Sequence, residues 1–242
     1  MDQTFQREAM LLGPEALERL AGCHVIVFGI GGVGSYCAEA LARAGLGALT
    51  FVDNDTIGES NLNRQLIALR STIGRNKSDV MAERVRDINP SCRVTSLPFL
   101  YHEESKAQFF NGSHYDYIVD AIDLVSCKLS LIETARDLGI PMISAMGTGN
   151  KLDPSQFRIT DISRTAGCPL ARILRKELRQ RGIEHHTVLY SEELPLRPAE
   201  LEDPPPGRRS IPGSVSWVPS CAGLMIAGYV VQALLKNQQE LR

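Results

Sequence analysis

A glycine-rich turn followed by an acidic residue carries the first chemical signal in this sequence. Residues 29–34 read Gly-Ile-Gly-Gly-Val-Gly, between an apolar run and a segment with helical spacing. Glycines at such a junction let backbone N–H groups approach a phosphate, and the helix N-terminus adds positive potential. Asp53 ends the next apolar run, about 20 residues further on, where a carboxylate can accept hydrogen bonds from ribose hydroxyls. The two features predict a nucleotide site.

The glycine turn and Asp53 fit an NAD-dependent dehydrogenase as well as they fit an ATP-dependent enzyme. The segment that follows favours ATP, because Arg64 lies among amides in Asn-Leu-Asn-Arg-Gln and Lys77 opens the next helical segment. Hydride transfer creates no new phosphate charge, whereas expulsion of pyrophosphate requires cations around the phosphates. Arg64 can bind phosphate through two hydrogen bonds and Lys77 can act as a point charge. The alternative is that both are solvated surface cations.

Two aspartates at the end of a later apolar run suggest a metal ligand. Asp120 and Asp123 belong to Asp-Ala-Ile-Asp, and the carboxyl ends of parallel strands face the ligand crevice. We expect Asp123 to hold Mg²⁺ with the phosphates, whereas Asp120 either joins it or caps the helix that begins near Ser126. The predicted catalytic residues are Arg64, Lys77 and Asp123. The predicted nucleotide-binding residues are Gly29, Gly31, Gly32, Gly34, Asp53, Asp55, Asn61, Arg64, Gln65, Lys77, Asp120 and Asp123.

The elements around these residues alternate in a way that predicts an α/β fold with a mostly parallel, Rossmann-like sheet covered by helices on both faces. We expect a single domain over 1–242, with a nucleotide-binding core at about 20–147 and an extension at about 148–242 that adds antiparallel strands. The expected core strands are 24–30, 48–52, 93–97, 117–122 and 140–145, and those of the extension are 156–163 and 214–218. A basic helix and a proline-rich crossover, 192–212, separate the last two.

The composition indicates a folded protein rather than a disordered or coiled-coil chain. The 242 residues are 43% hydrophobic with a formal net charge of −2, so any polyanion site must be local. Six cysteines occur singly, without a C-x-x-C pair that would suggest zinc or redox chemistry. Because we find no targeting segment, we expect a cytoplasmic protein with no membrane partner, in which the interrupted apolar run 215–235 forms a buried helix.

The motifs together resemble the ubiquitin-activating-enzyme-like superfamily over most of residues 20–146. They are Gly-Ile-Gly-Gly-Val-Gly-Ser, Val-Asp-Asn-Asp, Ser-Asn-Leu-Asn-Arg-Gln, the Lys77 helix and Asp-Ala-Ile-Asp. The resemblance implies that the chain binds ATP on a Rossmann-like sheet, adenylates a carboxylate and forms a homodimer. It also implies that Asn61, Arg64, Lys77 and Asp123 contact ATP and magnesium. By the same resemblance, Arg7 would reach the partner subunit's ATP, although a loosely held terminus is the alternative.

Three further segments are similar to the branch that contains the tRNA threonylcarbamoyladenosine dehydratases. They are 81–94, Cys-Pro-Leu-Ala at 168–171, and 213–223. This similarity implies a tRNA substrate whose threonylcarbamoyl group is cyclised. One alternative is an activator of a ubiquitin-like sulfur carrier, although such activators commonly carry two C-x-x-C zinc motifs that this chain lacks. Another is a nucleotide-binding partner of a cysteine desulfurase that does not turn over.

A cationic stripe on the expected basic helix is the candidate surface for tRNA phosphates. It consists of Arg172, Arg175, Lys176 and Arg179, spaced i, i+3, i+4 and i+7, with Arg164 nearby. We expect apolar residues to anchor the opposite face, namely Leu170, Ile173, Leu174 and Leu178. The alternative is an ordinary amphipathic helix with a solvated face. Cys168, just before this helix, is either a thiol activated by the helix dipole or an inert core residue.

Overall fold

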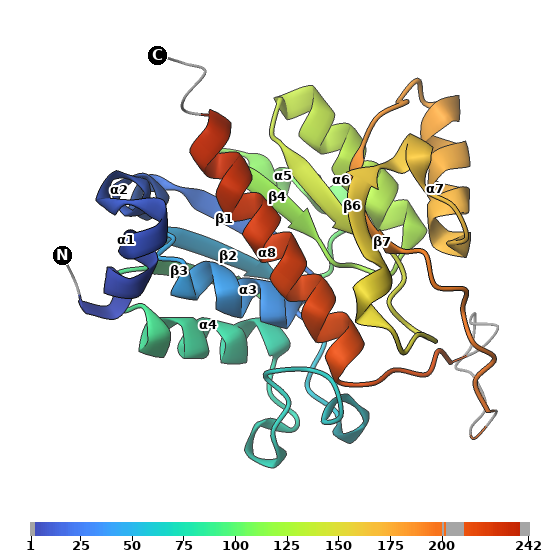
Figure 1. Cartoon of the computed structure of the whole chain (residues 1–242), viewed down its shortest axis with the longest axis horizontal. Helices are drawn as coiled ribbons and strands as arrows, with labels where there is room; N and C mark the ends of the chain where they lie inside the picture. The colour runs from blue at the N-terminus through green and yellow to red at the C-terminus, as the bar shows by residue number, and fades with distance from the viewer. Residues whose placement is uncertain (1–2, 200, 202–210, 238–242) are drawn as a thin grey trace.

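A single seven-stranded sheet organises the chain in the computed structural model, which describes residues 3–199, 201 and 211–237. The strand order is β3-β2-β1-β4-β5-β7-β6, and every neighbouring pair is parallel except β6 and β7 (Figure 1). The strands are β1 (His24–Phe28), β2 (Ala48–Val52), β3 (Arg93–Leu97), β4 (Tyr117–Asp120), β5 (Met142–Ala145), β6 (Phe157–Asp161) and β7 (Thr187–Ser191).

The central strands form because their apolar runs are covered on both faces. Every residue of β2 is buried, as are four of the five residues of β1, which is typical of parallel strands between two helical layers. The strand order reverses beside β1, which pairs with β2 on one side and β4 on the other. Ligands of open α/β sheets bind at such a reversal, beyond the carboxyl ends of the strands. Phe28, Val52 and Asp120 are in register there.

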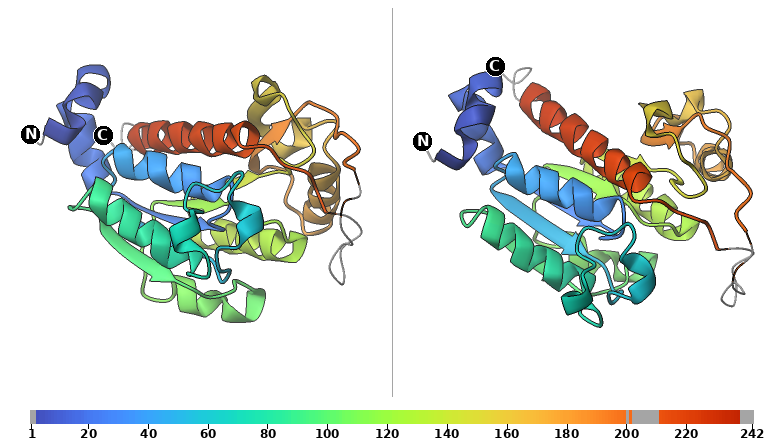
Figure 2. Two further views of the ribbon diagram at one scale, coloured as in Figure 1. Left: turned by 90° about the horizontal axis from the view of Figure 1, so that it is seen from below. Right: turned by 60° about the horizontal axis from the view of Figure 1, so that its bottom comes forward.

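Helices cover the two faces in separate groups. The core on one face joins the sheet to α3, α4 and α8, and the core on the other joins it to α5, α6 and α7. Figure 2 shows α3 and α8 together on one side of the sheet. The helices are α1 (Gln6–Leu12), α2 (Pro14–Gly22), α3 (Gly34–Arg43), α4 (Lys77–Ile88), α5 (Lys106–Phe110), α6 (Val125–Leu138), α7 (Pro169–Gln180) and α8 (Trp217–Asn237).

Short 3₁₀ helices form some of the connections among the described residues. They are η1 (Gln3–Phe5), η2 (Glu59–Asn61), η3 (Arg70–Thr72), η4 (Glu103–Ser105), η5 (Pro154–Gln156) and η6 (Ile162–Arg164). Two of them bear on function: η2 leads into Arg64, and η6 leads into the basic helix α7.

The last helix, α8, crosses α3 at a glycine. A Cβ atom at Gly223 would lie 2.3 Å from the Val33 carbonyl oxygen and 2.9 Å from the Cys37 nitrogen, so only glycine allows this approach. By length and composition Trp217–Lys236 could also cross a membrane. Half of that stretch is buried inside the protein, however, and Val218, Ile226 and Val230 belong to the core against α3. The structure therefore uses α8 as a core helix.

The expected strands agree with the structure except at the C-terminal end. Each of the five core strands and the 156–163 strand overlaps an observed strand. The strand expected at 214–218 is wrong, because α8 begins at Trp217 and accommodates Pro219 in its first turn, where the missing N–H costs nothing. The seventh strand is β7 instead, a buried run within the extension. Of the crossover prolines, Pro204, Pro205 and Pro206 lie outside the described residues.

The α3–α8 contact predicts opposite outcomes for two glycines of the same helix. Gly223→Ala should lower the free energy of unfolding by about 1–3 kcal/mol, because the added methyl group overlaps backbone atoms of α3. Gly228→Ala, where no atom lies within 4 Å of the added Cβ, should raise that free energy by up to about 1 kcal/mol through helix propensity. Urea denaturation measures both. Equal effects of the two substitutions would contradict the proposed crossing.

Candidate nucleotide-binding site

The glycine turn closes on itself so tightly that two of its glycines have no substitute. A Cβ atom at Gly34 would lie 1.8 Å from the Gly29 carbonyl oxygen. Gly29 has a φ of +86°, and a Cβ there would meet the Ala121 carbonyl oxygen at 2.7 Å. Gly31 differs, because the nearest atom to its added Cβ is Gln65 Nε2 at 3.8 Å. The turn therefore packs tightly against the end of β4 at Gly29, whereas Gly31, which faces Gln65, is not closely packed.

Asp53 holds this turn through its carboxylate. Its Oδ2 accepts a hydrogen bond from the Ile30 backbone N–H at 2.6 Å, and its Oδ1 accepts one from Asp55 N–H at 2.8 Å. Desolvation raises the pKa of the Asp53 carboxyl, opposed by the Ile30 hydrogen bond and by the positive charge of Lys77. The structure thus places Asp53 directly beside the glycine turn and gives it a structural role. Its predicted contact with a ribose stays a prediction.

Ser35 connects the turn to the segment that carries the predicted cations. Its Oγ donates to the Gly31 carbonyl oxygen at 2.6 Å and accepts from the Leu66 N–H at 3.3 Å. Ser35 is not among the predicted site residues, although it follows the glycine motif directly. Its fully buried side chain fixes the distance between the turn and residues 61–66.

Arg64 is a half-buried cation without an acidic partner among the residues that the structure describes. Its Nη1 donates to the Ser60 carbonyl oxygen at 2.7 Å and to Asn63 Oδ1 at 2.9 Å. Both acceptors are neutral, and burial lowers the pKa of the guanidinium. A desolvated positive charge without a counterion is destabilising, so the geometry suits a site that receives an anion.

Gln65 and Asn61 flank Arg64 and lie in the same segment. Gln65 is 8% exposed, and its Oε1 is buried without a hydrogen-bond partner within the described part of the chain. Since buried polar atoms are normally paired, this oxygen lacks a donor. The other end of the amide, the donor Nε2, is the end that lies next to Gly31. Asn61 is already engaged through Oδ1, which accepts from the Gly58 N–H at 3.2 Å.

Lys77 and Asp55 form an ion pair at the start of α4. Lys77 Nζ lies 2.9 Å from Asp55 Oδ2, and the Lys77 backbone N–H donates to the Asp55 carbonyl oxygen at 3.0 Å. The lysine is buried, whereas the aspartate side chain is 63% exposed. Lys77 is therefore fixed under the site by Asp55, and its predicted direct contact with a phosphate stays a prediction.

Asp120 and Asp123 have different environments, which separates their roles. Asp120 and Lys128 are both fully buried, and Lys128 Nζ donates to Asp120 Oδ2 at 2.9 Å and to the Ala145 carbonyl oxygen at 2.8 Å. Asp120 Oδ1 accepts from the Ile122 N–H at 3.0 Å. The expectation that Asp120 touches the nucleotide is not supported, because an internal lysine neutralises it. Asp123 is exposed, beyond the end of β4.

The structure divides the predicted cationic stripe on α7. Arg172, Lys176, Arg179 and Arg164 are exposed, and none of them has a carboxylate within ion-pair distance in the described ranges. Arg175 is different, because its Nη1 donates to Thr165 Oγ1 at 2.7 Å and to the Thr165 carbonyl oxygen at 2.8 Å. Arg175 therefore fixes the turn before α7. Ile173, expected to anchor the helix, is 47% exposed, so that expectation is wrong.

Metal-ligand clusters are absent from the described part of the chain, and five of the six cysteines are buried. That part contains no group of three or more His, Cys, Asp and Glu side chains that could hold an ion. Cys168 precedes α7 as its N-cap residue and is 6% exposed. These environments agree with the inert interpretation of Cys168.

Comparison with known proteins identifies the family of this chain. The ThiF family model matches residues 5–242. The chain belongs to the ThiF family. This ThiF-family chain is 43% identical to the tRNA threonylcarbamoyladenosine dehydratase of Bacillus subtilis (strain 168), over 96% of its own length and 95% of the relative's.

Two solved structures resemble the ThiF-family chain over almost its whole length. They are those of Escherichia coli tRNA N6-threonylcarbamoyladenosine dehydratase, TcdA, in complex with ATP and with AMP. Each has a TM-score of 0.88 at 36% identity and covers 98% of this chain and 96% of the matched chain. The match extends through β6, β7 and α8, so the family resemblance includes the C-terminal extension.

The buried network behind Asp120 predicts a pH effect on stability. His186 Nε2 lies 2.8 Å from Ser144 Oγ, and burial lowers the pKa of His186 to about 4, with Asp120 and Asp161 raising it and Lys128 lowering it. Below the ordinary histidine pKa of about 6.5, His186 is protonated in the unfolded chain but stays neutral in the folded chain until the pH approaches about 4. This group's contribution is thus complete above about pH 6.5 and falls by about 1.4 kcal/mol per pH unit down to about pH 4.

His186→Asn should remove this dependence. The difference in unfolding free energy between the native chain and the variant should therefore shrink as the pH falls from 6 to 5, when measured by urea denaturation at each pH. His185→Asn, at the neighbouring exposed position, is the control and should keep the native slope. A native slope in His186→Asn would contradict a neutral buried His186.

Proposed function

We propose that this protein uses ATP to adenylate the carboxylate of the threonylcarbamoyl group on tRNA threonylcarbamoyladenosine and then cyclises that group, with net loss of water. The observation that carries the proposal is the environment of Arg64. This half-buried guanidinium has no counterion among the described residues and belongs to a residue that lies next to the glycine turn. The dehydratases named above support the acceptor, and the ATP and AMP complexes of TcdA support the nucleotide.

Adenylation solves a leaving-group problem. A free carboxylate is a poor electrophile, and loss of hydroxide from it is unfavourable. In the proposed reaction the threonyl carboxylate oxygen bonds to the α-phosphorus of ATP and pyrophosphate leaves. The carbamoyl group then bonds to the activated carbonyl carbon and loses a proton, and AMP leaves with the former carboxylate oxygen. The oxygen of the lost water thus ends in AMP. Both ring-forming atoms belong to the substrate, and positioning can supply much of the rate.

The residues of the site divide this work. Gly31, Gly32 and Gly34 would receive the phosphates on backbone N–H groups at the start of α3. Gly29 would shape the turn instead, because its N–H already donates to the Val52 carbonyl oxygen at 2.8 Å. Arg64 would neutralise charge on the phosphates, and Gln65 would donate to them from Nε2, the end of its amide that lies next to Gly31. Asp53 would bind the ribose while retaining its hold on Ile30. Lys77, fixed by Asp55, would add a second positive charge beneath the site.

Asp123 is the residue that would hold Mg²⁺. Magnesium sites that act on nucleotides commonly use one or two carboxylates together with phosphate oxygens and water. A single exposed aspartate at the carboxyl end of β4 fits this donor set. Bound there, Mg²⁺ would neutralise phosphate charge as pyrophosphate leaves.

The exposed cations of α7 are the proposed tRNA surface. They lie on η6 and α7, which connect β6 to β7 at the edge of the sheet, and are Arg164, Arg172, Lys176 and Arg179. Cations that are not neutralised by acidic neighbours bind phosphates through release of counterions. Arg175 is left out of this surface, because its guanidinium already donates hydrogen bonds to Thr165.

The outer face of α8 is the proposed contact with a second copy of the chain. Its exposed apolar residues are Trp217, Leu224, Met225 and Tyr229, the first two about half exposed. Exposed apolar side chains along the outer face of a core helix are costly in water, and a two-fold pairing of identical helices would cover them. Arg7, exposed on α1, could then reach the partner.

The remaining assignments follow from the same proposal. Residues 1–242 form one adenylation domain, since β6 and β7 extend the sheet of the nucleotide-binding core. The protein acts in the cytoplasm, where its tRNA substrate is found, and has no membrane partner. A cysteine desulfurase partner is less well supported, because sulfur transfer requires an accessible thiol and five of the six cysteines are buried.

The direct test is mass spectrometry of nucleosides from tRNA incubated with the protein and ATP. We expect threonylcarbamoyladenosine to lose the mass of one water, with one AMP formed per event. Arg64→Ala should slow the reaction about 10²-fold or more, as expected on removal of one preorganised charge donor. Pyrophosphate exchange stimulated by a Gly-Gly-ended protein, with tRNA inert, would overturn the proposal in favour of a sulfur-carrier activator.

Charge reversal on α7 tests the tRNA surface. The triple variant Arg172→Glu, Lys176→Glu and Arg179→Glu should weaken tRNA binding about tenfold or more. It should also reduce the slope of log affinity against log salt by about 3, roughly one per lost phosphate contact. Filter binding at several salt concentrations measures both, with Lys106→Glu on α5 as the control. Unchanged affinity and slope in the triple variant would refute this surface.

A further inference from the structure

Asn63 uses both ends of its side-chain amide, and the two ends serve different parts of the molecule. Its Oδ1 accepts a hydrogen bond from Arg64 Nη1 at 2.9 Å. Its Nδ2 donates to the carbonyl oxygen of Ser214, 151 positions further along the chain, at 2.9 Å. Ser214 lies just before α8 begins at Trp217. One exposed asparagine therefore joins the guanidinium of the candidate phosphate site to the C-terminal extension.

The Ser214 end of this link is itself fastened, through Asn150. Gly213 N–H donates to Asn150 Oδ1 at 2.7 Å, and Asn150 N–H donates to the Gly213 carbonyl oxygen at 2.8 Å. The Asn150 carbonyl oxygen also accepts from the Leu196 N–H at 2.8 Å. Asn150 has a φ of +60°, the only positive value for a non-glycine residue in the described ranges. Such backbone strain requires compensation from surrounding contacts.

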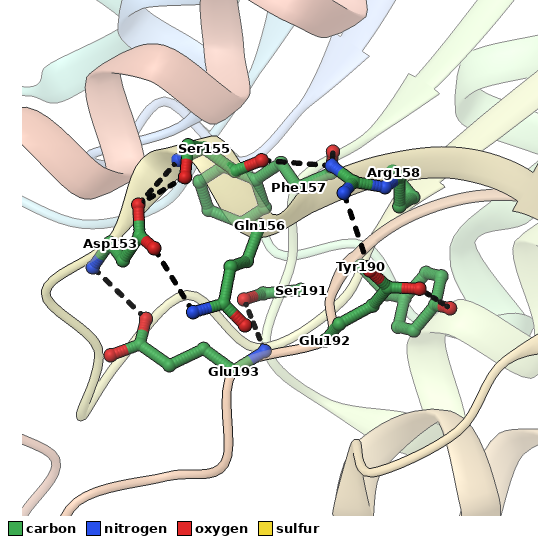
Figure 3. A network of polar contacts seen from close by, with 9 residues as sticks. All are labelled: Asp153, Ser155, Gln156, Phe157, Arg158, Tyr190, Ser191, Glu192 and Glu193. Atoms are coloured by element: carbon green, nitrogen blue, oxygen red, sulfur yellow. Dashed lines mark hydrogen bonds and ion pairs between the residues drawn. The ribbon is translucent and has the colours of Figure 1, made fainter.

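The segment after Asn150 is held by a dense polar network. The Glu193 carboxylate accepts from the Leu152 N–H at 2.9 Å and from the Asp153 N–H at 3.1 Å. Figure 3 shows Glu193 facing Asp153, whose carboxylate in turn accepts from Ser155 and Gln156. On the other side, Trp217 Nε1 donates to the Leu152 carbonyl oxygen at 2.8 Å. Residues 150–153 thus form a fixed point for the chain that enters α8.

We propose that Asn63 is a positioning residue that holds the Arg64 guanidinium in its phosphate-facing orientation, and that Asn150 acts on Arg64 through Gly213, Ser214 and Asn63. The inference rests on the proposed ATP site. It adds that the C-terminal extension controls the affinity of that site for ATP by fixing the orientation of Arg64. The path begins where Asn150 Oδ1 accepts from the Gly213 N–H. The next residue, Ser214, accepts from Asn63 Nδ2 through its carbonyl oxygen, and Asn63 Oδ1 accepts from Arg64 Nη1.

The chemistry of the path explains why an amide stands at 63. An arginine side chain has several rotatable bonds, and both the Ser60 carbonyl oxygen and Asn63 Oδ1 accept from the same nitrogen, Nη1. One acceptor alone would leave the guanidinium free to turn about that contact. A second acceptor restricts the guanidinium only if that acceptor is itself held, which the bond to Ser214 accomplishes. An amide can accept from a cation and donate to a carbonyl at the same time, whereas a carboxylate or a hydrocarbon cannot do both.

The test measures ATP affinity by calorimetry in the absence of tRNA for Asn63→Ala, Asn150→Gly and the double variant. Glycine at 150 tolerates the positive φ and removes only the side-chain acceptor. We expect Asn63→Ala to weaken ATP binding about tenfold and Asn150→Gly to weaken it a few-fold, although Asn150 does not contact Arg64. The double variant should bind no more weakly than Asn63→Ala, because both changes interrupt the same path.

Asn111→Ala, an exposed asparagine at the end of α5, is the matched control and should bind ATP normally. Partial unfolding would reduce the number of sites per chain without changing the dissociation constant, so calorimetric stoichiometry separates a positioning role from a structural one. Native affinity in Asn150→Gly, or additive losses in the double variant, would overturn the inference. Failure of the native chain to bind ATP would overturn the proposed function instead.

Discussion

The closure of the glycine turn between β1 and α3 is the constraint on which the rest of the site depends. Gly34 approaches the Gly29 carbonyl oxygen so closely that no side chain fits between them, and Gly29 rests against Ala121 at the end of β4. The turn can close only where β1 lies between β2 and β4, with Asp53 at the end of β2 to receive the Ile30 N–H. The candidate nucleotide site therefore depends on the sheet topology.

The distribution of charge distinguishes residues that support the site from residues that can act in it. Asp120 is paired with Lys128 inside the core, so these two charges are balanced within the protein, whereas Asp55, the partner of Lys77, has a side chain that is 63% exposed. Arg64 has only neutral acceptors among the described residues. A bound polyanion would supply the missing charge, which is why Arg64 carries the functional argument and Asp120 does not.

The sequence predicted those parts of the fold and site that depend on local pattern. The glycine turn and Asp53 were predictable because a strand, a turn and a helix follow one another within 30 residues, about the length of a βαβ unit. The pairing of Asp120 with Lys128 was not, since it depends on the burial of a helix face that carries a lysine. Likewise β7 is a short run whose strand character comes from its place between β5 and β6. The roles of Asn63 and Arg175 depend on distant backbone atoms, which no spacing rule identifies.

Thermal unfolding of the protein with saturating ATP and, separately, with NAD distinguishes a triphosphate site over Gly31 from a dinucleotide site. A triphosphate site should make ATP raise the melting temperature, by the equivalent of about 2.7 kcal/mol at a concentration of 100 times Kd, and NAD should leave it unchanged. Equal or greater stabilisation by NAD would mean that the turn binds a dinucleotide.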